Sequence, residues 1–191
     1  EITDRSTTPA VFQSGTIFDP TAVSPSSYWI PTVMVSGQGH AAFIFSRSGS
    51  SVKANTATTG RLSGDVLGTT QLVSTITSST FNYNVQISGT QRWGDYSNMS
   101  LDPDDNMTMW GVAGYCNATN SWGMRVTKLL APLPPPLTSA TPPNLTPGQS
   151  SVNVTILGTP ANGEGFYDPG VGFTNRISST ISGGVTVNST T

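Results

Sequence analysis

The densest group of side chains that could do chemistry is an acidic turn made of Asp102, Asp104, Asp105 and Asn106. Carboxylate and amide oxygens are the hard ligands that Ca²⁺ prefers in proteins. The turn lacks the alternating acids, the glycine and the twelfth-position glutamate that an EF-hand loop requires. Two hypotheses follow, a structural calcium site at Asp102, Asp104 and Asp105 or a solvated acidic turn without metal.

Carboxylates that could cleave a glycosidic bond are scarce. Glycosidases generally place two acidic side chains on either side of the scissile bond. The chain has only two glutamates, Glu1 and Glu164. Asp65, Asp95 and Asp102 could supply such a pair, but no local motif selects any two of them. We therefore expect no catalytic residues and predict that the protein is not an enzyme.

The single histidine and the single cysteine each limit the chemistry. His40 would have to serve any Ser-His-Asp triad, but it follows a turn and the chain contains no G-x-S-x-G motif. We predict that His40 is a surface or hairpin residue. One cysteine, Cys116, excludes an internal disulfide and a CxxC metal site. We predict that Cys116 is a small buried hydrophobe, with a disulfide to another chain as the alternative.

Several asparagines lie in N-x-S/T sequences, which accept N-linked glycans in secreted proteins of organisms that glycosylate. The six candidate glycosylation sites are Asn98, Asn106, Asn117, Asn144, Asn153 and Asn188. A chain rich in serine and threonine contains several such sequences by chance, so uncharged turn chemistry is the alternative interpretation.

Three of the four tryptophans, Trp93, Trp110 and Trp122, lie between Gln91 and Leu130. Such rings could form a platform that stacks on sugars, or they could pack in the core. We favour core packing. Truncation of Trp110 to alanine should then destabilise the fold by about 3–5 kcal/mol.

The composition indicates an all-β protein. Charged residues make up only 9%, serine and threonine make up more than a quarter, and there are 20 glycines and 14 prolines. Few segments therefore offer the residues that long helices need. The net charge of −2 gives no electrostatic reason to expect a nucleic-acid partner. No apolar run approaches the roughly 18 residues of a membrane helix, so we expect no membrane insertion.

Alternation of apolar and polar residues between turns rich in Asp, Asn, Pro and Gly predicts short antiparallel strands. The predicted strands are Ala10–Phe12, Thr16–Phe18, Tyr28–Ser36, His40–Arg47, Arg61–Gly68, Gln71–Thr77, Phe81–Ile87, Ser97–Asp102, Met107–Tyr115, Trp122–Leu130, Ser151–Leu157, Arg176–Ile181 and Gly184–Asn188. We predict a flexible loop at Ser48–Gly60. Residues 131–149 hold consecutive prolines, which predicts a semi-rigid polyproline linker between two modules.

Ordered motifs along the chain carry a family resemblance. Ser46–Ser48, Gly60–Asp65 and Trp93–Ser97 come in that order, and a D-P-x-D turn follows. This series resembles the run-in to the last blade of the sialidase-like β-propeller region of large secreted bacterial surface proteins. It covers about Tyr28–Leu130. The residues from Ser100 to Trp110 are also similar to an Asp-box, which is a structural hairpin and not an active site.

A second resemblance lies behind the proline-rich segment. The sequence GFYDPGVGFTNRI at Gly165–Ile177 is similar to a string found in the immunoglobulin-like domains that follow such propellers. Together the resemblances imply partial β-propeller-like antiparallel sheets in residues 1–130 and an incomplete immunoglobulin-like β-sandwich in residues 150–191. Propellers have 4–8 four-stranded blades and a sandwich has about 7 strands. We therefore expect a longer parent chain or neighbouring copies to complete the sheets.

The expected function follows from these features. The family resemblance suggests a sialidase, but the positions of Glu1 and Glu164 match no catalytic pattern that could be carried over. We expect a non-enzymatic, secreted structural, adhesion or assembly protein of a cell-surface layer or filament, with no cofactor besides structural calcium. Its partners would be other copies of itself or the rest of a longer chain. The alternative is a carbohydrate-binding or glycoside-hydrolysing propeller fragment, which would gather exposed Trp and Arg around one pocket.

Overall fold

The computed structural model describes residues 2–3, 10–130, 136–159, 166–174 and 177–188. All regular elements in these ranges are β-strands, and every strand pair is antiparallel, which confirms the all-β prediction. The strands are β1 (Ile2–Thr3), β2 (Ala10–Val11), β3 (Ser27–Val35), β4 (Ala41–Ser48), β5 (Asn55–Arg61), β6 (Ser74–Thr77), β7 (Gln86–Ile87), β8 (Thr90–Gln91), β9 (Asn98–Leu101), β10 (Met109–Ala118), β11 (Ser121–Leu129), β12 (Leu137–Thr141) and β13 (Thr155–Gly158). A helix able to cross a membrane is not found in the described part of the chain.

The first sheet is a four-stranded meander in the order β3-β4-β5-β6. Its edge strand β3 is interrupted by Pro31, which has no amide hydrogen to donate to the ladder. The register between β3 and β4 shifts between Trp29 and Thr32, and Ile30 has φ of 53°. This irregularity bends β3 and places Trp29 at the end of the sheet beyond the bulge.

The second sheet has three strands in the order β11-β10-β9. Strands β10 and β11 form a long hairpin that pairs Met109 with Leu129 at one end and Ala118 with Ser121 at the other. Asn120 closes the hairpin with φ of 57°, a left-handed conformation that asparagine tolerates better than most residues.

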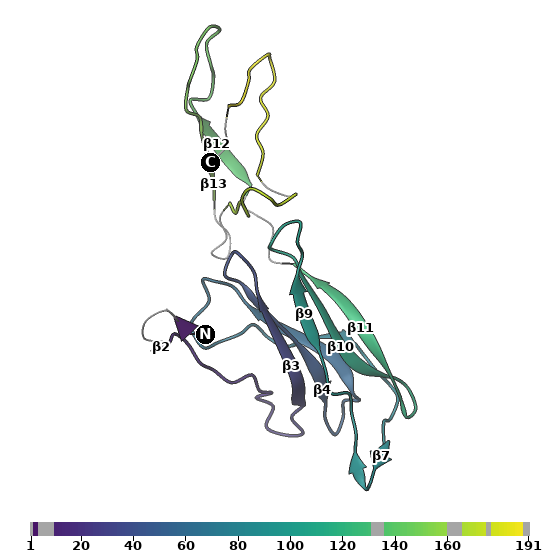
Figure 1. Cartoon of the computed structure of the whole chain (residues 1–191). Helices are drawn as coiled ribbons and strands as arrows, with labels where there is room; N and C mark the ends of the chain where they lie inside the picture. Colours follow the sequence, from purple (N-terminus) through teal and green to yellow (C-terminus); the bar gives the residue numbers. More distant parts are fainter. Residues whose placement is uncertain (1, 4–9, 131–135, 160–165, 175–176, 189–191) are drawn as a thin grey trace.

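The two sheets pack face to face, and a small core lies between them (Figure 1). Its buried apolar residues are Ala42, Ile44, Met99, Met109 and Ala113. Gly111 of β10 lets the sheets approach, since a Cβ there would lie 3.0 Å from Cδ1 of Ile44. This packing fixes which face of β10 points inward and therefore which residues are left on the outer face of the second sheet.

Polar side chains also join the sheets. Ser46 of β4 donates to the carbonyl of Gly114 at 3.1 Å, and the Thr56 hydroxyl of β5 reaches the same oxygen at 3.1 Å. The amide of Cys116 donates to the carbonyl of Ala54 at 2.8 Å. Because these groups are largely buried, such bonds satisfy backbone oxygens that would otherwise be costly to remove from water.

Several sequence predictions are wrong in this part of the chain. Ser48–Gly60 is not a flexible loop, because β5 runs through it and is among the most buried strands. The predicted strand Arg61–Gly68 is a turn, in which the Arg61 guanidinium donates to the carbonyl of Asp65 at 2.8 Å. Thr16–Phe18 forms no strand.

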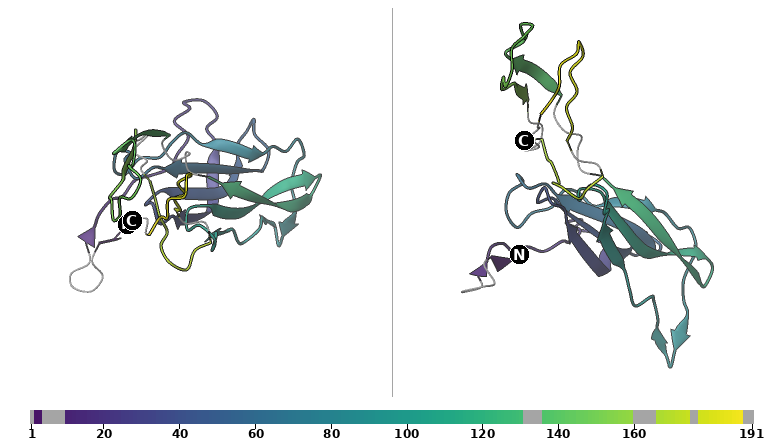
Figure 2. Two further views of the ribbon diagram at one scale, coloured as in Figure 1. Left: turned by 90° about the horizontal axis from the view of Figure 1, so that it is seen from above. Right: turned by 45° about the horizontal axis from the view of Figure 1, so that its top comes forward.

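Strands β12 and β13 pair as a separate hairpin beyond the end of the two packed sheets (Figures 1 and 2). Strand β12 lies inside the range predicted as a polyproline linker, so a polyproline conformation is wrong for those residues. Residues 177–188 carry no strand, contrary to the strands predicted there, while residues 175–176 lie outside the described ranges. The propeller-like and immunoglobulin-like assignments stay predictions.

Candidate binding site

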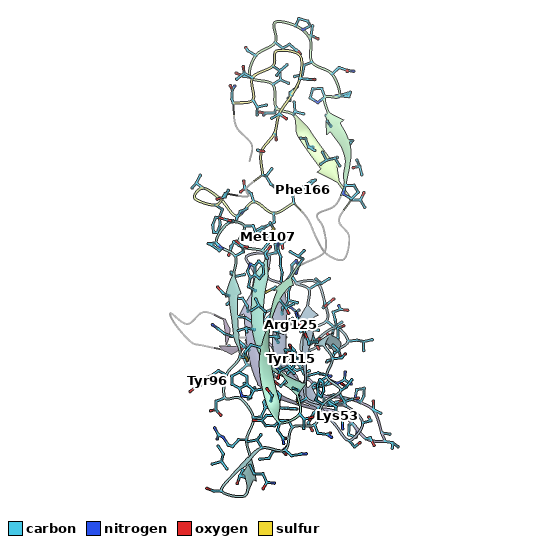
Figure 3. All side chains as sticks on the ribbon, turned by 90° about the vertical axis from the view of Figure 1, so that its right-hand side faces the viewer. Lys53, Tyr96, Met107, Tyr115, Arg125 and Phe166 are labelled. Carbon is cyan, nitrogen blue, oxygen red and sulfur yellow. The ribbon has the colours of Figure 1, made fainter. Side chains whose placement is uncertain are left out.

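A pocket with a cavity of about 350 Å³ opens at the end of the packed sheets that carries Lys53, opposite the end that carries Met107 (Figure 3). We call it the aromatic pocket. Its walls come from the bulged end of β3, the turn between β4 and β5, and the two segments on either side of the β7–β8 hairpin. Its lining residues are Trp29, Ser48, Gly49, Val52, Lys53, Ala54, Phe81, Asn82, Tyr83, Asn84, Gln91 and Trp93.

Aromatic rings in edge-to-face contact form much of the wall. Trp93 meets Trp29 with ring centroids 6.3 Å apart at 76°, and it meets Tyr83 at 4.9 Å and 85°. Such arrangements suit the quadrupoles of aromatic rings. The indole nitrogen of Trp93 donates to the Ser46 hydroxyl at 3.0 Å, which fixes the central ring to the polar contact between the sheets.

Hydrogen bonds hold the segment Asn82–Asn84 against the β10–β11 turn. The amide of Asn120 donates to the Asn82 carbonyl at 2.9 Å, and the Asn84 amide donates to Oδ1 of Asn120 at 2.8 Å. On the opposite wall, Lys53 donates to Oδ1 of Asn82. The pocket wall is therefore held in place by two distant turns.

The lining contains side-chain amides, the hydroxyls of Ser48 and Tyr83 and one charged group, Lys53, but neither aspartate nor glutamate. A pair of carboxylates is what most glycosidases need. The pocket presents aromatic ring surface together with side-chain amides that can donate and accept hydrogen bonds.

Each of the three scattered aspartates is engaged locally. Asp65 accepts hydrogen bonds from the amide of Leu62 at 2.9 Å and from the side chain of Gln71 at 2.8 Å. Asp95 pairs with Arg92 at 2.9 Å on the surface. Asp102 belongs to the acidic turn. Their contacts stabilise turns, and the structure shows no shared site for Asp65, Asp95 and Asp102.

In the acidic turn, Asp102 organises the backbone and one tryptophan. Its Oδ1 accepts from the amide of Asp104 at 3.0 Å, and its Oδ2 accepts from the indole nitrogen of Trp110 at 2.9 Å. The carboxylate of Asp104 accepts from the hydroxyl of Thr174 at 3.3 Å. These bonds give the two carboxylates structural roles.

Asp105 caps the same turn from inside. Its carboxylate accepts from the amides of Met107 and Thr108, each at 2.8 Å, and from the Thr108 hydroxyl at 2.7 Å. Burial alone would raise the pKa of Asp105, but these hydrogen bonds outweigh burial and hold its pKa below the ordinary value. Thr108, which the sequence placed in a strand, thus completes the turn.

Within the described ranges, no three side chains of His, Cys, Asp or Glu gather as a set that could hold a metal ion. The residues that could offer oxygen ligands are still those of the acidic turn, where the carboxylates accept hydrogen bonds from the chain. A calcium site at Asp102, Asp104 and Asp105 stays a prediction.

His40 and Cys116 are both buried. His40 is 3% exposed, and its Nδ1 accepts a hydrogen bond from the Ser63 amide at 2.9 Å. The predicted surface position of His40 is therefore wrong, although it does stand in the turn before β4. Cys116 is 1% exposed on β10, which confirms the prediction of a small buried hydrophobe.

The three tryptophans that were predicted to pack in the core differ in how far they are buried. Trp110 and Trp122 are 40% and 54% exposed, so core packing is wrong for these two and the large loss predicted for Trp110 truncation no longer follows. Trp93 is half-buried in the aromatic pocket. Sequence reasoning missed Trp29, Phe81 and Tyr83 as pocket residues, since no local pattern brings them to Trp93.

The candidate glycosylation sites differ in their surroundings. Asn106 is half-buried, and its side-chain nitrogen donates to the hydroxyl of Tyr167 at 2.8 Å. The other five are exposed, at Asn98, Asn117, Asn144, Asn153 and Asn188. Glycosylation itself stays a prediction.

Comparison of the chain with models of protein families, with curated proteins and with solved structures finds no match. The structure itself supports an all-β chain with several antiparallel sheets. Any function must be argued from the surface and the pocket themselves.

Proposed function

We propose that this chain is a non-enzymatic, extracellular structural, adhesion or assembly protein. Its second sheet is covered by a further β-sheet, supplied by a longer parent chain or by a neighbouring subunit. The observation that carries the proposal is the exposed apolar outer face of that sheet. The resemblance to propeller regions of secreted surface proteins supports it, since blades of a propeller stack sheet upon sheet.

The outer face is continuous across β10 and β11. Cross-strand partners share one face of an antiparallel sheet, and the pair Val112↔Val126 lies between the pairs Trp110↔Lys128 and Gly114↔Met124. Val126 is 64% exposed and Met124 is 44% exposed, beside the half-exposed indole of Trp110. A contiguous apolar patch of this kind marks an interaction surface more often than scattered exposed residues do.

The edge of the second sheet adds to the argument. Strand β11 pairs with β10 on one side, and its other side carries no partner among the described strands. An unpaired edge strand is a ready template for another strand. The same sheet already buries its inner face against the first sheet through Met99, Met109 and Ala113. A third sheet packed on the outer face would repeat this arrangement.

Two measurements test the proposal. One is the mass of the native particle, and the other identifies the residues that become cross-linked to Lys128. Lys128 lies on the outer face, and its Nζ is 5.7 Å from the ring centre of Trp110. Lys53 lies at the aromatic pocket instead. We expect an amine-reactive cross-linker to join Lys128 to another copy or to a segment beyond this chain. The denatured mass of this chain alone is 19.9 kDa, so a larger native mass would reveal neighbouring copies.

A matched pair of variants sharpens the test. Val126→Lys places a charge on the outer face and should reduce the native mass to that of one chain. Val66→Lys, at a residue that is 75% exposed in a turn, is the control and should leave assembly unchanged. If the native protein, with any parent chain intact, forms no Lys128 cross-link and both variants behave like the wild type, the proposal is wrong.

A further inference from the structure

We propose that the aromatic pocket binds a pyranose ring of a neutral glycan. The lining residues of this site are not those of the exposed patch on the outer face of the second sheet, and the two regions meet where Trp93 lies beside Gly114. Its lining combines exposed aromatic surface from Phe81 with the rings of Trp29, Tyr83 and Trp93 and with the side-chain amide of Asn84.

The chemistry of a sugar fits this lining. One face of a pyranose carries C–H groups and packs on aromatic surface, while its rim of hydroxyls both donates and accepts hydrogen bonds. Side-chain amides such as those of Asn84 and Gln91 offer a donor and an acceptor on one group. The pocket exposes more polar than apolar surface, so hydrogen bonds to the sugar hydroxyls would contribute much of the recognition beside the contact with the rings.

The volume favours a small ligand. At about 350 Å³ the cavity lies near the lower end of the range of about 300–1,000 Å³ that is typical of ligand sites. One or two sugar rings suit this space better than an extended peptide. Lys53 is the only charged lining residue; it is exposed to solvent and donates to Asn82, so its charge is screened and a ligand needs no negative charge to bind.

The walls are ordered before a ligand arrives. Trp93 is held by the hydroxyl of Ser46, and Asn82 and Asn84 are held by the turn at Asn120. A site that is already ordered loses less entropy on binding. This matters for a small sugar, since its few atoms offer a limited number of contacts.

Binding is tested on the whole chain by saturation-transfer NMR and tryptophan fluorescence. The probes are methyl β-D-glucopyranoside, methyl β-D-galactopyranoside, methyl α-D-mannopyranoside and N-acetyl-D-glucosamine. We expect at least one of them to bind saturably with a Kd of about 1 mM, the scale expected for so small a ligand.

Two variants locate the site. Phe81→Ala removes aromatic surface that is 43% exposed, and Asn84→Ala removes a side-chain amide while keeping the backbone bond to Asn120. Each should weaken binding of the active probe about tenfold. Phe18→Ala is the control, because Phe18 is an exposed phenylalanine (66%) that does not line the pocket. Thermal unfolding followed by circular dichroism checks that each variant is folded. If Phe81→Ala does not fold, the binding measured for Asn84→Ala decides the test.

Three results would overturn the proposal. The first is no saturable binding of any of the four sugars. The second is unchanged binding in the folded Asn84→Ala and Phe81→Ala proteins, which would place the sugar elsewhere. The third is saturable binding of a proline-rich peptide that is lost in both variants and displaces every sugar probe at a much lower concentration, which would make the pocket a peptide site.

Discussion

The side-chain amide of Asn106 donates a hydrogen bond to the hydroxyl of Tyr167 at 2.8 Å, across 61 residues of sequence. The backbone at Gly37 completes the contact, because its amide donates to the Asn106 carbonyl at 2.9 Å. A Cβ at Gly37 would overlap both the Tyr167 hydroxyl and the Asn106 amide nitrogen. The first hairpin, the acidic turn and residues 166–174 thus meet at the same end of the sheets (Figure 3).

Substitution of Gly37 by alanine should release this contact. The added Cβ occupies the space of the Tyr167 hydroxyl, so we expect faster amide hydrogen exchange in residues 166–174, with the strands β4 and β10 unchanged. Gly94→Ala is the matched control, because a Cβ at Gly94 meets no atom within 4 Å. Tyr167→Phe should reproduce the effect and lower the free energy of unfolding by about 0.5–1.5 kcal/mol. Equal exchange in all four proteins would show that the contact is not formed in solution.

The close approach of Gly111 and Ile44 makes a second prediction, about the core between the sheets. Gly111→Ala adds a methyl group 3.0 Å from Cδ1 of Ile44 and should cost about 1–3 kcal/mol. Ile44→Val removes Cδ1 and should alone cost about 0.5–1.5 kcal/mol. In the double variant the loss should be smaller than the sum by at least about 0.5 kcal/mol. Chemical denaturation of the four proteins measures this coupling, and strict additivity would mean that the two sheets do not pack at this point.

The strands that could be predicted from sequence are those with local signals. Strands β3, β4, β9, β10 and β11 were each predicted to within three residues, because apolar alternation and flanking turns mark them. Strand β5 was missed since its sequence, NTATTGR, is polar. Thr56 and Thr59 are buried because their hydroxyls donate to carbonyls elsewhere in the chain, Thr56 to Ala113 and Thr59 to Gln71. Such partners do not appear in a local pattern.

The candidate pocket was even less accessible to sequence reasoning. Trp93 was singled out for its type, but its neighbours Trp29 and Tyr83 reach it only through the bulge in β3 and the bond between Asn84 and Asn120. For the acidic turn, the residue types did indicate where a candidate site lies. Its location was predicted, but its carboxylates are engaged by backbone amides, which residue types alone could not reveal.

The third prediction concerns acid. The pKa of Asp105 is lower in the folded protein than in the unfolded chain, where the pKa of an aspartate is about 3.9. Its stabilising contribution is therefore complete above about pH 5 and is lost as the pH falls below about 4 toward the folded pKa. Asp105→Asn should destabilise the protein at pH 7, by about 1–3 kcal/mol for the lost charge-assisted bonds. The difference from the wild type should shrink at pH 3, as measured by urea denaturation at each pH, and a difference that grows on acidification would contradict this assignment.

The last prediction concerns the only thiol. Cys116 is 1% exposed, and its amide ties β10 to the turn before β5 through Ala54. Access to the sulfur therefore requires the two sheets to separate, so labelling should follow unfolding and not local fraying. We expect Ellman's reagent to react with the native protein at least about a hundredfold more slowly than with the chain in denaturant. The destabilising Gly111→Ala change should accelerate labelling, whereas Gly94→Ala should not. Rapid labelling of the native wild type, or a disulfide-linked dimer on a non-reducing gel, would show instead that Cys116 is accessible and that pairing between chains is real.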